Sequence, residues 1–299
     1  MKILITGANG LLGQKLVSLI SSGTEHELIA TGRGRNRLPE TGAYTYAEMD
    51  ISDHGQVMEV IGRYKPDSVI HTAAMTNVDQ CEEERDACWK MNVTAVSHII
   101  DACREVGAHL VHVSTDFIFD GSRGPLTEDE EPAPVNYYGE SKLAAEKEVI
   151  SSGISWSIAR TVLVYGIAHD MSRSNIILWV KKSLEEEKDI NVVDDQWRTP
   201  TLAEDLAQGC FLLAVSKKNG IFNISGKDML TPYDMAIATA EFFQLDGSFI
   251  HRTDGSKFRQ KAKRPPRTGF IIDKARSELG YEPHSFNEGL AVLRDQLGS

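Results

Sequence analysis

The sequence KILITGANGLLG, residues 2–13, decides the fold that we predict for this chain. Its first five residues form an apolar run typical of a buried strand, and the pattern that continues to about Ser22 predicts a helix. Glycines between a strand and a helix allow a tight turn, let backbone amides approach a pyrophosphate, and let the helix pack closely on the strand. We therefore expect a dinucleotide-binding turn. Its predicted contacts are Gly7, Asn9, Gly10, Leu11, Leu12 and Gly13.

The second predicted strand, residues 26–31, ends at Gly32-Arg33-Gly34-Arg35. NAD-selective proteins usually carry Asp or Glu here for the ribose hydroxyls, and these four residues include no acid. Arg33 and Arg35 can instead hold a 2′-phosphate through charge-assisted hydrogen bonds. We therefore expect NADPH as the cofactor and leave NADH open as a second one. The alternative is that Arg33 and Arg35 are solvated loop charges.

Three later segments supply further predicted cofactor contacts. After a strand at residues 44–49, the Asp50 carboxylate is expected to accept from an adenine amino group or, alternatively, to cap the helix that begins near Asp53. A strand at 68–72 leads into a turn of small residues that suits close approach of a cofactor. A long helix at 87–106 carries an asparagine towards the sheet. The predicted contacts are Asp50, Ile51, Ala73, Ala74 and Asn92.

Three side chains that follow the fifth strand, residues 109–114, have the chemistry of an active site. Tyr138 and Lys142 are four residues apart on a predicted helix and therefore project to the same side. A neighbouring cation favours the phenolate, so we expect Lys142 to lower the tyrosine pKa from its usual value near ~10. Thr115, at the end of the strand, supplies a second hydroxyl as the third member of the group. A Tyr-x-x-x-Lys pair alone is usually a solvated surface pair, and the dinucleotide turn gives it its context.

Composition excludes several classes of protein. The 299 residues are 41% hydrophobic and 25% charged, which is typical of a globular protein. A net charge of −11 argues against a nucleic-acid or anionic-membrane surface. No window approaches the ~18 consecutive apolar residues of a membrane span, and residues 1–2 lead directly into a strand, so we expect a cytoplasmic protein. The spacing of the four cysteines indicates reduced packing residues and no metal site.

The order of predicted elements indicates an α/β fold. Strands alternate with helices to about Asn223, which predicts a Rossmann-type doubly wound parallel sheet with a smaller C-terminal substrate-binding lobe. We assign residues 1–165 to the dinucleotide-binding domain, with returning segments at about 190–225, and residues 166–299 mainly to the lobe. Beyond residue 165 we expect a strand at 190–193 and helices at 175–187, 202–215, 232–243 and 286–297. The basic run 261–267 is either a solvated connector or a functional loop.

These motifs together resemble the extended short-chain dehydrogenase/reductases and, within them, the dTDP-4-dehydrorhamnose reductase family, over nearly the whole chain. The residues that carry the resemblance are Gly7 to Gly13, Ala73 to Asp79, Asn92, Ser114 to Gly121, Tyr138 to Lys142, Arg160 to Gly166 and Asp195 to Thr201. The resemblance implies catalytic roles for Thr115, Tyr138 and Lys142. Tyr138 and Lys142 are also predicted cofactor contacts, and Lys142 is expected to hold the nicotinamide ribose. The resemblance also implies that the Thr-x-Val-Asp loop, residues 76–79, and the turn 195–201 lie near a sugar nucleotide. The predicted substrate contacts are Thr76, Val78, Asp116, Asn175, Arg198 and Thr201.

Two departures from the family pattern bear on which sugar is bound. Arg198 stands where the turn usually has glycine, and the family's Arg-Pro-x-x-Ser-x-Leu segment reads Arg-Pro-Pro-Arg-Thr-Gly-Phe at residues 264–270. Arg198 and the basic run 261–267 are expected to face the substrate diphosphate.

The resemblance implies NADPH-dependent reduction of the 4-keto group of a nucleotide-activated 6-deoxysugar, of the dTDP-4-dehydro-L-rhamnose to dTDP-L-rhamnose type, in the biosynthesis of cell-surface polysaccharide sugars. We expect a nucleotide-sugar substrate and a homodimer, and leave assistance by Mg²⁺ open. A sugar-nucleotide dehydratase would need an Asp-Glu pair after the threonine, whereas Phe117 follows Asp116 here. Two alternatives stay open: a sugar-nucleotide epimerase, and a regulatory subunit like the beta subunit of methionine adenosyltransferase.

Overall fold

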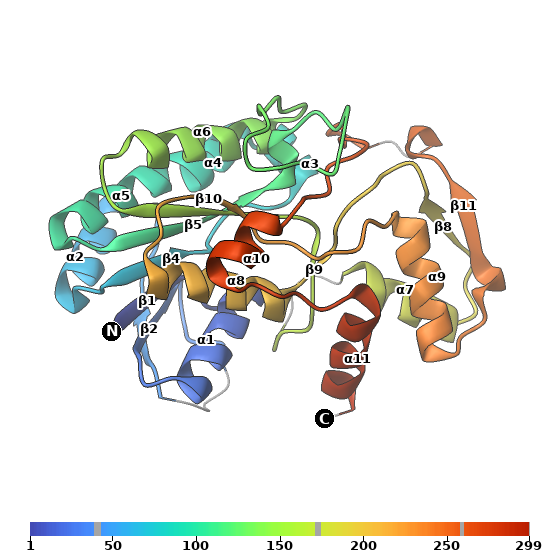
Figure 1. The fold of residues 1–299 in the computed structure, drawn as a ribbon, viewed down its shortest axis with the longest axis horizontal. Coiled ribbons are helices and arrows are strands. Elements are labelled where there is room, and N and C mark those ends of the chain that lie inside the picture. Colours follow the sequence, from blue (N-terminus) through green and yellow to red (C-terminus); the bar gives the residue numbers. More distant parts are fainter. Residues whose placement is uncertain (39–42, 171–174, 258–259, 299) are drawn as a thin grey trace.

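The computed structural model describes residues 1–38, 43–170, 175–257 and 260–298. A seven-stranded sheet forms its centre, with strand order β10-β6-β5-β4-β1-β2-β3 and parallel pairing throughout (Figure 1). The order reverses between β1 and β4, so the carboxyl ends of these strands make the crevice where doubly wound sheets bind their ligands. The strands are β1 (Lys2–Thr6), β2 (Glu27–Gly32), β3 (Thr45–Glu48), β4 (Ser68–His71), β5 (His109–Thr115), β6 (Trp156–Thr161) and β10 (Gly220–Asn223).

Helices cover both faces of the sheet, which explains why the strand sequences are continuously apolar. Ile3 and Ile5 of β1 belong to the core on one face, under α1 (Leu11–Gly23), α8 (Ala203–Ser216) and α10 (Asp273–Leu279). Leu4, between them, belongs to the core on the other face. There the covering helices are α2 (His54–Tyr64), α5 (Ala95–Val106) and α6 (Tyr137–Ser151). The predicted doubly wound fold is confirmed.

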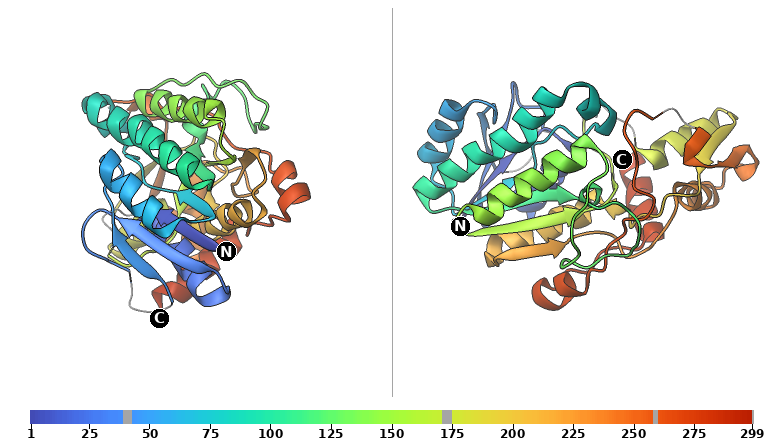
Figure 2. Two further views of the ribbon diagram at one scale, coloured as in Figure 1. Left: turned by 90° about the vertical axis from the view of Figure 1, so that its left-hand side faces the viewer. Right: turned by 90° about the horizontal axis from the view of Figure 1, so that it is seen from above.

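A smaller lobe lies beyond the carboxyl ends of the strands, as Figures 1 and 2 show. It contains α7 (Ile176–Glu185), α9 (Pro232–Phe243) and α11 (Phe286–Leu297). In the same lobe β8 (Ile190–Val193) pairs in parallel with β11 (Ile250–Thr253). Val180, Val192 and Ala236 pack together there in a core separate from those of the main sheet. A short parallel pair, β7 (Val164–Tyr165) with β9 (Thr201–Leu202), lies between the lobe and the sheet.

Several predicted elements differ from the observed ones. The helices expected at 232–243 and 286–297 are α9 and α11, but the strand expected at 190–193 joins the small sheet of the lobe. The long helix expected at 87–106 consists of α4 (Arg85–Trp89), a π-helical turn η1 (Lys90–Thr94) and α5. The remaining short helices are α3 (Val78–Glu83), η2 (Asp116–Ile118), η3 (Gly247–Phe249) and η4 (Gly255–Lys257). Within the described residues, no helix has both the length and the apolar character needed to cross a membrane.

Candidate active site

The turn between β1 and α1 has the geometry of a pyrophosphate cradle. Gly7 has a φ of 69°, and a Cβ added to it would lie 2.9 Å from the Cα of Ala73. A Cβ on Gly13 would lie 2.3 Å from the carbonyl oxygen of Gly7, so glycine alone lets the helix pack this closely. Among the described residues no side chain caps α1 at Gly10, so the first-turn amides are available to an anion. These residues fit a dinucleotide.

Asn9 organises the loop that follows β2. Its side chain donates to the Tyr46 hydroxyl at 3.1 Å and to the Arg35 carbonyl at 3.2 Å, and it accepts from the Arg37 amide at 2.9 Å. Leu11 and Leu12 are half-buried at the start of α1. Asn9, which we predicted to contact the cofactor, thus holds the loop that carries Arg33, whose side chain is exposed.

A carboxylate reaches this loop from another strand. Glu48 lies beside Gly32 in the β2–β3 register, and its Oε1 accepts from the Gly34 amide at 3.1 Å. The four residues after β2 contain no acid, but the fold brings one to the same corner. Sequence reasoning missed Glu48 because it considered only the residues that follow β2. Parallel pairing of the next predicted strand with β2 is the signal that places Glu48 at the same corner.

Asp50 lies after β3 but does not cap the next helix. Its Oδ1 accepts from the Ser52 amide at 2.9 Å, whereas Asp53 is the N-cap of α2 and accepts from the Gln56 amide at 3.1 Å. The alternative interpretation of Asp50 as a helix cap is therefore wrong. The adenine contact stays a prediction, and Ile51 beside it is buried.

Asn92 lies in the π-helical turn η1 and links the turn after β4 to α6. Its Oδ1 accepts from the Met75 amide at 2.8 Å, and its Nδ2 donates to the Met75 carbonyl at 3.0 Å and to the Ser141 hydroxyl at 3.0 Å. Single π-helical turns occur frequently at functional sites. Asn92 thereby anchors the segment that contains Ala73 and Ala74, both of which are half-buried.

The structure brings Thr115, Tyr138 and Lys142 together. Thr115 ends β5, and α6 starts at Tyr137 because the Asn136 side chain caps it and accepts from the Gly139 amide at 2.8 Å. The Thr115 hydroxyl neighbours the Tyr138 phenol and lowers its pKa. Only 8% of the Tyr138 side chain is exposed. A phenol and a second hydroxyl thus lie beside each other on two adjoining elements.

Burial controls the charge state of this cluster. It raises the pKa of Tyr138, an effect that the Thr115 hydrogen bond only partly opposes. It also lowers the pKa of Lys142 to about 8. The Lys142 ammonium lies against β5, where it donates to the Val113 carbonyl at 2.8 Å and lies 3.3 Å from His112 Nε2. The pKa of Tyr138 is therefore raised, and the expectation that Lys142 lowers it is wrong, because desolvation is the larger effect.

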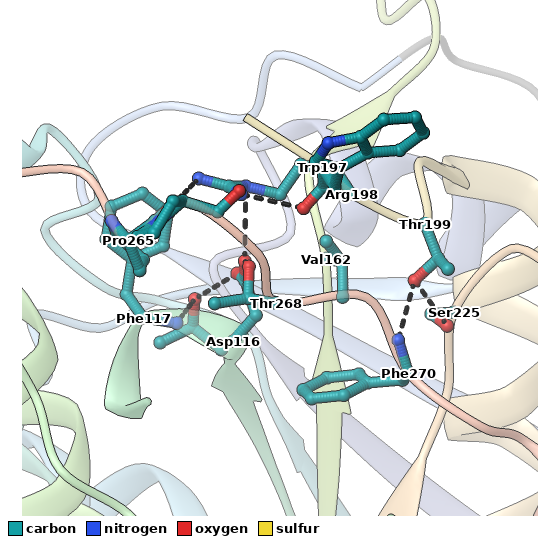
Figure 3. Close-up of polar contacts among 12 residues, drawn as sticks. Asp116, Phe117, Val162, Trp197, Arg198, Thr199, Ser225, Pro265, Thr268 and Phe270 are labelled. Atoms are coloured by element: carbon teal, nitrogen blue, oxygen red, sulfur yellow. Dashed lines mark hydrogen bonds and ion pairs between the residues drawn. The ribbon is translucent and has the colours of Figure 1, made fainter. Parts of the chain in front are cut away.

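Asp116 and Arg198, both predicted to contact substrate, are instead bound to each other (Figure 3). Arg198 Nε lies 3.5 Å from Asp116 Oδ2, and both side chains are almost completely buried. The Arg198 guanidinium also donates to the carbonyls of Trp197 at 2.8 Å and Pro265 at 2.6 Å. Since these groups occupy the guanidinium, the geometry does not fit the expectation that Arg198 faces a substrate diphosphate.

Comparison with known proteins places the chain in a family. A family model described as the RmlD substrate binding domain matches residues 1–298. The chain belongs to this family. The structure of dTDP-4-dehydrorhamnose reductase from Bacillus anthracis in complex with NADP is similar, with a TM-score of 0.86, 28% identity and coverage of 99% of both chains.

Two curated relatives differ in their described roles. The spore coat polysaccharide biosynthesis protein SpsK of Bacillus subtilis is 31% identical over 299 residues, which cover 100% of this chain and 98% of that protein. The methionine adenosyltransferase 2 subunit beta of Rattus norvegicus is 31% identical over 254 residues, which cover 83% of this chain and 74% of that protein. The predicted family is confirmed, and it includes relatives with different roles.

The other predicted substrate contacts of this RmlD family member have distinct environments. Thr76 is exposed, and Val78 is the first residue of α3. Asn175 caps α7, where it accepts from the Ile177 and Leu178 amides at 3.1 Å. Thr201 is fully buried and donates to the Val162 carbonyl at 2.7 Å. The roles of Thr76 and Val78 stay predictions, whereas the side chains of Asn175 and Thr201 form hydrogen bonds with the backbone of the protein itself.

Proposed function

We propose that this protein reduces the 4-keto group of a nucleotide-activated 6-deoxysugar with NADPH, of the dTDP-4-dehydro-L-rhamnose to dTDP-L-rhamnose type, in the biosynthesis of cell-surface polysaccharide sugars. The observation that carries the proposal is the cluster of Thr115, Tyr138 and Lys142 at the carboxyl end of β5, the same edge of the parallel sheet at which the glycine turn follows β1. Family membership and the NADP complex of the Bacillus anthracis relative support the cofactor.

The nicotinamide, when bound, supplies a hydride to the carbonyl carbon. Tyr138 donates a proton to the carbonyl oxygen as that oxygen gains negative charge, and its raised pKa keeps it in the acid form that this step needs. Thr115 lies beside the phenol and orients it. Lys142 carries its charge below a pH of about 8 and provides positive potential where the oxyanion develops.

A regulatory role is the second candidate, because a methionine adenosyltransferase beta subunit matches 83% of this chain. In that case the nucleotide site would stabilise the protein and the binding of a catalytic partner would be the function. The catalytic cluster is compatible with both candidates, so only turnover separates them. The epimerase alternative predicts tightly held NAD and no net oxidation of added NADPH.

The test is incubation of the purified protein with NADPH or NADH and a panel of 4-keto sugar nucleotides, followed at the nicotinamide absorbance. We expect oxidation of NADPH with at least one substrate of the panel. Tyr138→Phe should abolish turnover and leave NADPH binding nearly unchanged, since it removes only the transferable proton.

Tyr137→Phe is the matched control, because this neighbouring phenol is half-buried and packs under Arg85, with the guanidinium carbon 4.8 Å from its ring centre. It should keep its turnover. A Tyr138→Phe variant that retains most of the wild-type rate would refute the assignment of the acid. Absence of turnover with every substrate, together with activation of an added methionine adenosyltransferase, would favour the regulatory role.

A further inference from the structure

A row of buried polar side chains crosses three neighbouring strands of the main sheet, from the glycine turn to Lys142. Thr6 ends β1, His71 ends β4, and His112 lies next to His71 in the β4–β5 register. Thr6 Oγ1 lies 2.8 Å from His71 Nδ1, and the rings of His71 and His112 stack with their centres 5.6 Å apart. No more than 2% of any of these three residues is exposed. The proposed reaction uses neither histidine.

His112 is an acceptor for the Lys142 ammonium. Its Nε2 lies 3.3 Å from Lys142 Nζ, and the Val113 carbonyl accepts from the same ammonium at 2.8 Å. An ammonium can only donate, so His112 must accept through Nε2 and carry its own proton on Nδ1. Burial and the Lys142 charge hold the pKa of His112 well below its usual value, which agrees with a neutral ring. Among the described residues, the contact with Lys142 is the only hydrogen bond of this ring.

The geometry points to His112 as a positioning residue that, together with the Val113 carbonyl, fixes the Lys142 ammonium against β5. The ammonium has three protons, and these two acceptors take two of them, which leaves the third for a group of a bound nucleotide. This inference rests on the proposed reductase function. It adds to that function a residue of the sheet interior that acts through Lys142.

The charge on Lys142 depends on several neighbours. Burial lowers its pKa to about 8, whereas Glu146 on the same helix and Cys88 on α4 raise it. Glu146 itself is paired with Arg160 of β6 at 2.7 Å. Substitutions at position 112 leave these groups in place but withdraw one hydrogen bond from the charged form of Lys142. Loss of the His112 acceptor should therefore lower the Lys142 pKa further.

The experiment compares H112L and H112Q with wild type through the pH dependence of kcat/KM for NADPH, with a 4-keto sugar nucleotide as the second substrate. In H112L the alkaline limb that we expect near pH 8 in wild type should move about one pH unit lower, the effect of losing one hydrogen bond to a charged group. H112Q should move the midpoint back towards wild type, because the carbonyl of a glutamine side chain can accept from the ammonium.

His109 provides the matched control. It is the first residue of the same strand, is fully buried, and lies 2.7 Å from the hydroxyls of both Ser155 and Ser157. H109L should therefore lose stability because it removes two buried contacts. Its alkaline limb should keep the wild-type midpoint, so a general effect of removing a buried histidine is separated from an effect on Lys142.

A second measurement does not depend on turnover. The folded-state pKa of Lys142, about 8, lies below its unfolded value of ~10.4. Between these values the unfolded chain holds the extra proton, so the contribution of Lys142 to stability in urea rises with pH. This contribution is the difference in free energy of unfolding between each protein and the same protein with K142M. In H112L the rise should begin about one pH unit lower than in wild type.

The two measurements separate the inference from the proposed function. If no sugar nucleotide is reduced, the proposed function fails, while the urea comparison still tests the contact between His112 and Lys142. A rise in H112L that begins at the wild-type pH, or an equal shift in H109L, would overturn the inference.

Discussion

Arg33 and Glu48 place opposite charges at the corner where the adenosine ribose of a dinucleotide is expected. The Arg33 side chain is exposed, and the Glu48 carboxylate is fixed by the Gly34 amide at 3.1 Å. An arginine favours a 2′-phosphate, whereas a carboxylate favours free ribose hydroxyls and repels the phosphate. Cofactor preference at this site therefore depends on the balance between the two residues.

We predict that wild type prefers NADPH in kcat/KM and that Arg33→Ala erases most of this preference. Loss of one charged hydrogen bond of ~1.5–3 kcal/mol corresponds to a fall of about ten- to a hundredfold in kcat/KM for NADPH. Glu48→Gln should act in the opposite direction and increase the preference, because it removes the repulsion. Arg35→Ala, on the same loop, is the comparison. A wild type that prefers NADH, or an Arg33→Ala change that weakens both cofactors equally, would contradict the role of Arg33.

Lys142 should give the reaction an alkaline limit. Its pKa of about 8 means that the ammonium is present below that pH and lost above it, so kcat/KM should fall as pH rises through about 8. Lys142→Met should lower kcat and weaken NADPH binding, and the alkaline limb should disappear. Lys147→Met, an exposed lysine on the same helix, should behave like wild type. Retention of the limb in Lys142→Met would assign it to another group.

At the scale of elements, the contact between α6 and η2 positions Tyr138, the acid of the proposed reaction. A Cβ on Gly139 would lie 2.1 Å from the carbonyl oxygen of Phe117, so the start of α6 rests directly on the segment after Thr115. Gly139 follows Tyr138 immediately. A larger residue at 139 must therefore move the helix that carries Tyr138 away from the strand end that carries Thr115.

We predict that Gly139→Ala lowers kcat and destabilises the fold by about 1–3 kcal/mol, the usual cost of overpacking. Turnover and urea unfolding measure the two effects. Gly62→Ala is the control: the described structure leaves open space around this glycine of α2, so alanine should be neutral or stabilising by up to ~1 kcal/mol. Unchanged turnover in Gly139→Ala would show that the spacing of α6 and η2 does not govern the acid.

At the scale of the whole molecule, residues 260–268 connect the lobe to the rim of the sheet. Arg264 forms two hydrogen bonds with the Asp79 carboxylate, at 3.1 and 2.8 Å, and these lower the pKa of Asp79. The Ala262 amide donates to the same carboxylate at 2.9 Å. The family's Thr-x-Val-Asp loop is thus tied to the basic run, and at least Arg264 of that run has a protein partner instead of being a solvated connector.

We predict that Asp79→Asn raises KM for the nucleotide sugar several-fold and increases amide hydrogen exchange in residues 260–268, because it releases the segment that borders the site. The stability cost should be small, at most about 1 kcal/mol, since the pair is partly exposed. Any stability that the pair contributes is present above the unfolded pKa of Asp79 and lost as pH falls through its lowered folded value. Glu83→Gln, which removes the exposed pair with Lys261, is the control. Equal exchange in both variants would contradict the prediction.

Local patterns in the sequence determined the first strand, turn and helix, the boundaries of α9 and α11, and the placement of Tyr138 and Lys142 on one helix. These signals lie within a few neighbouring residues: apolar periodicity, glycine at a tight turn, and side chains four apart on one helix. The fold class followed because alternating strands and helices have few stable arrangements.

Tertiary structure decided the features that depend on residues far apart in the chain. Strand register brought Glu48 to Gly34, and β8 found its partner in β11, which was not predicted. Arg198 met Asp116 across 82 positions, so two residues expected to bind substrate bind each other. Burial raised the pKa of Tyr138 when a neighbouring cation was expected to lower it. Desolvation and pairing between distant segments depend on the packed molecule, and no short stretch of sequence encodes them.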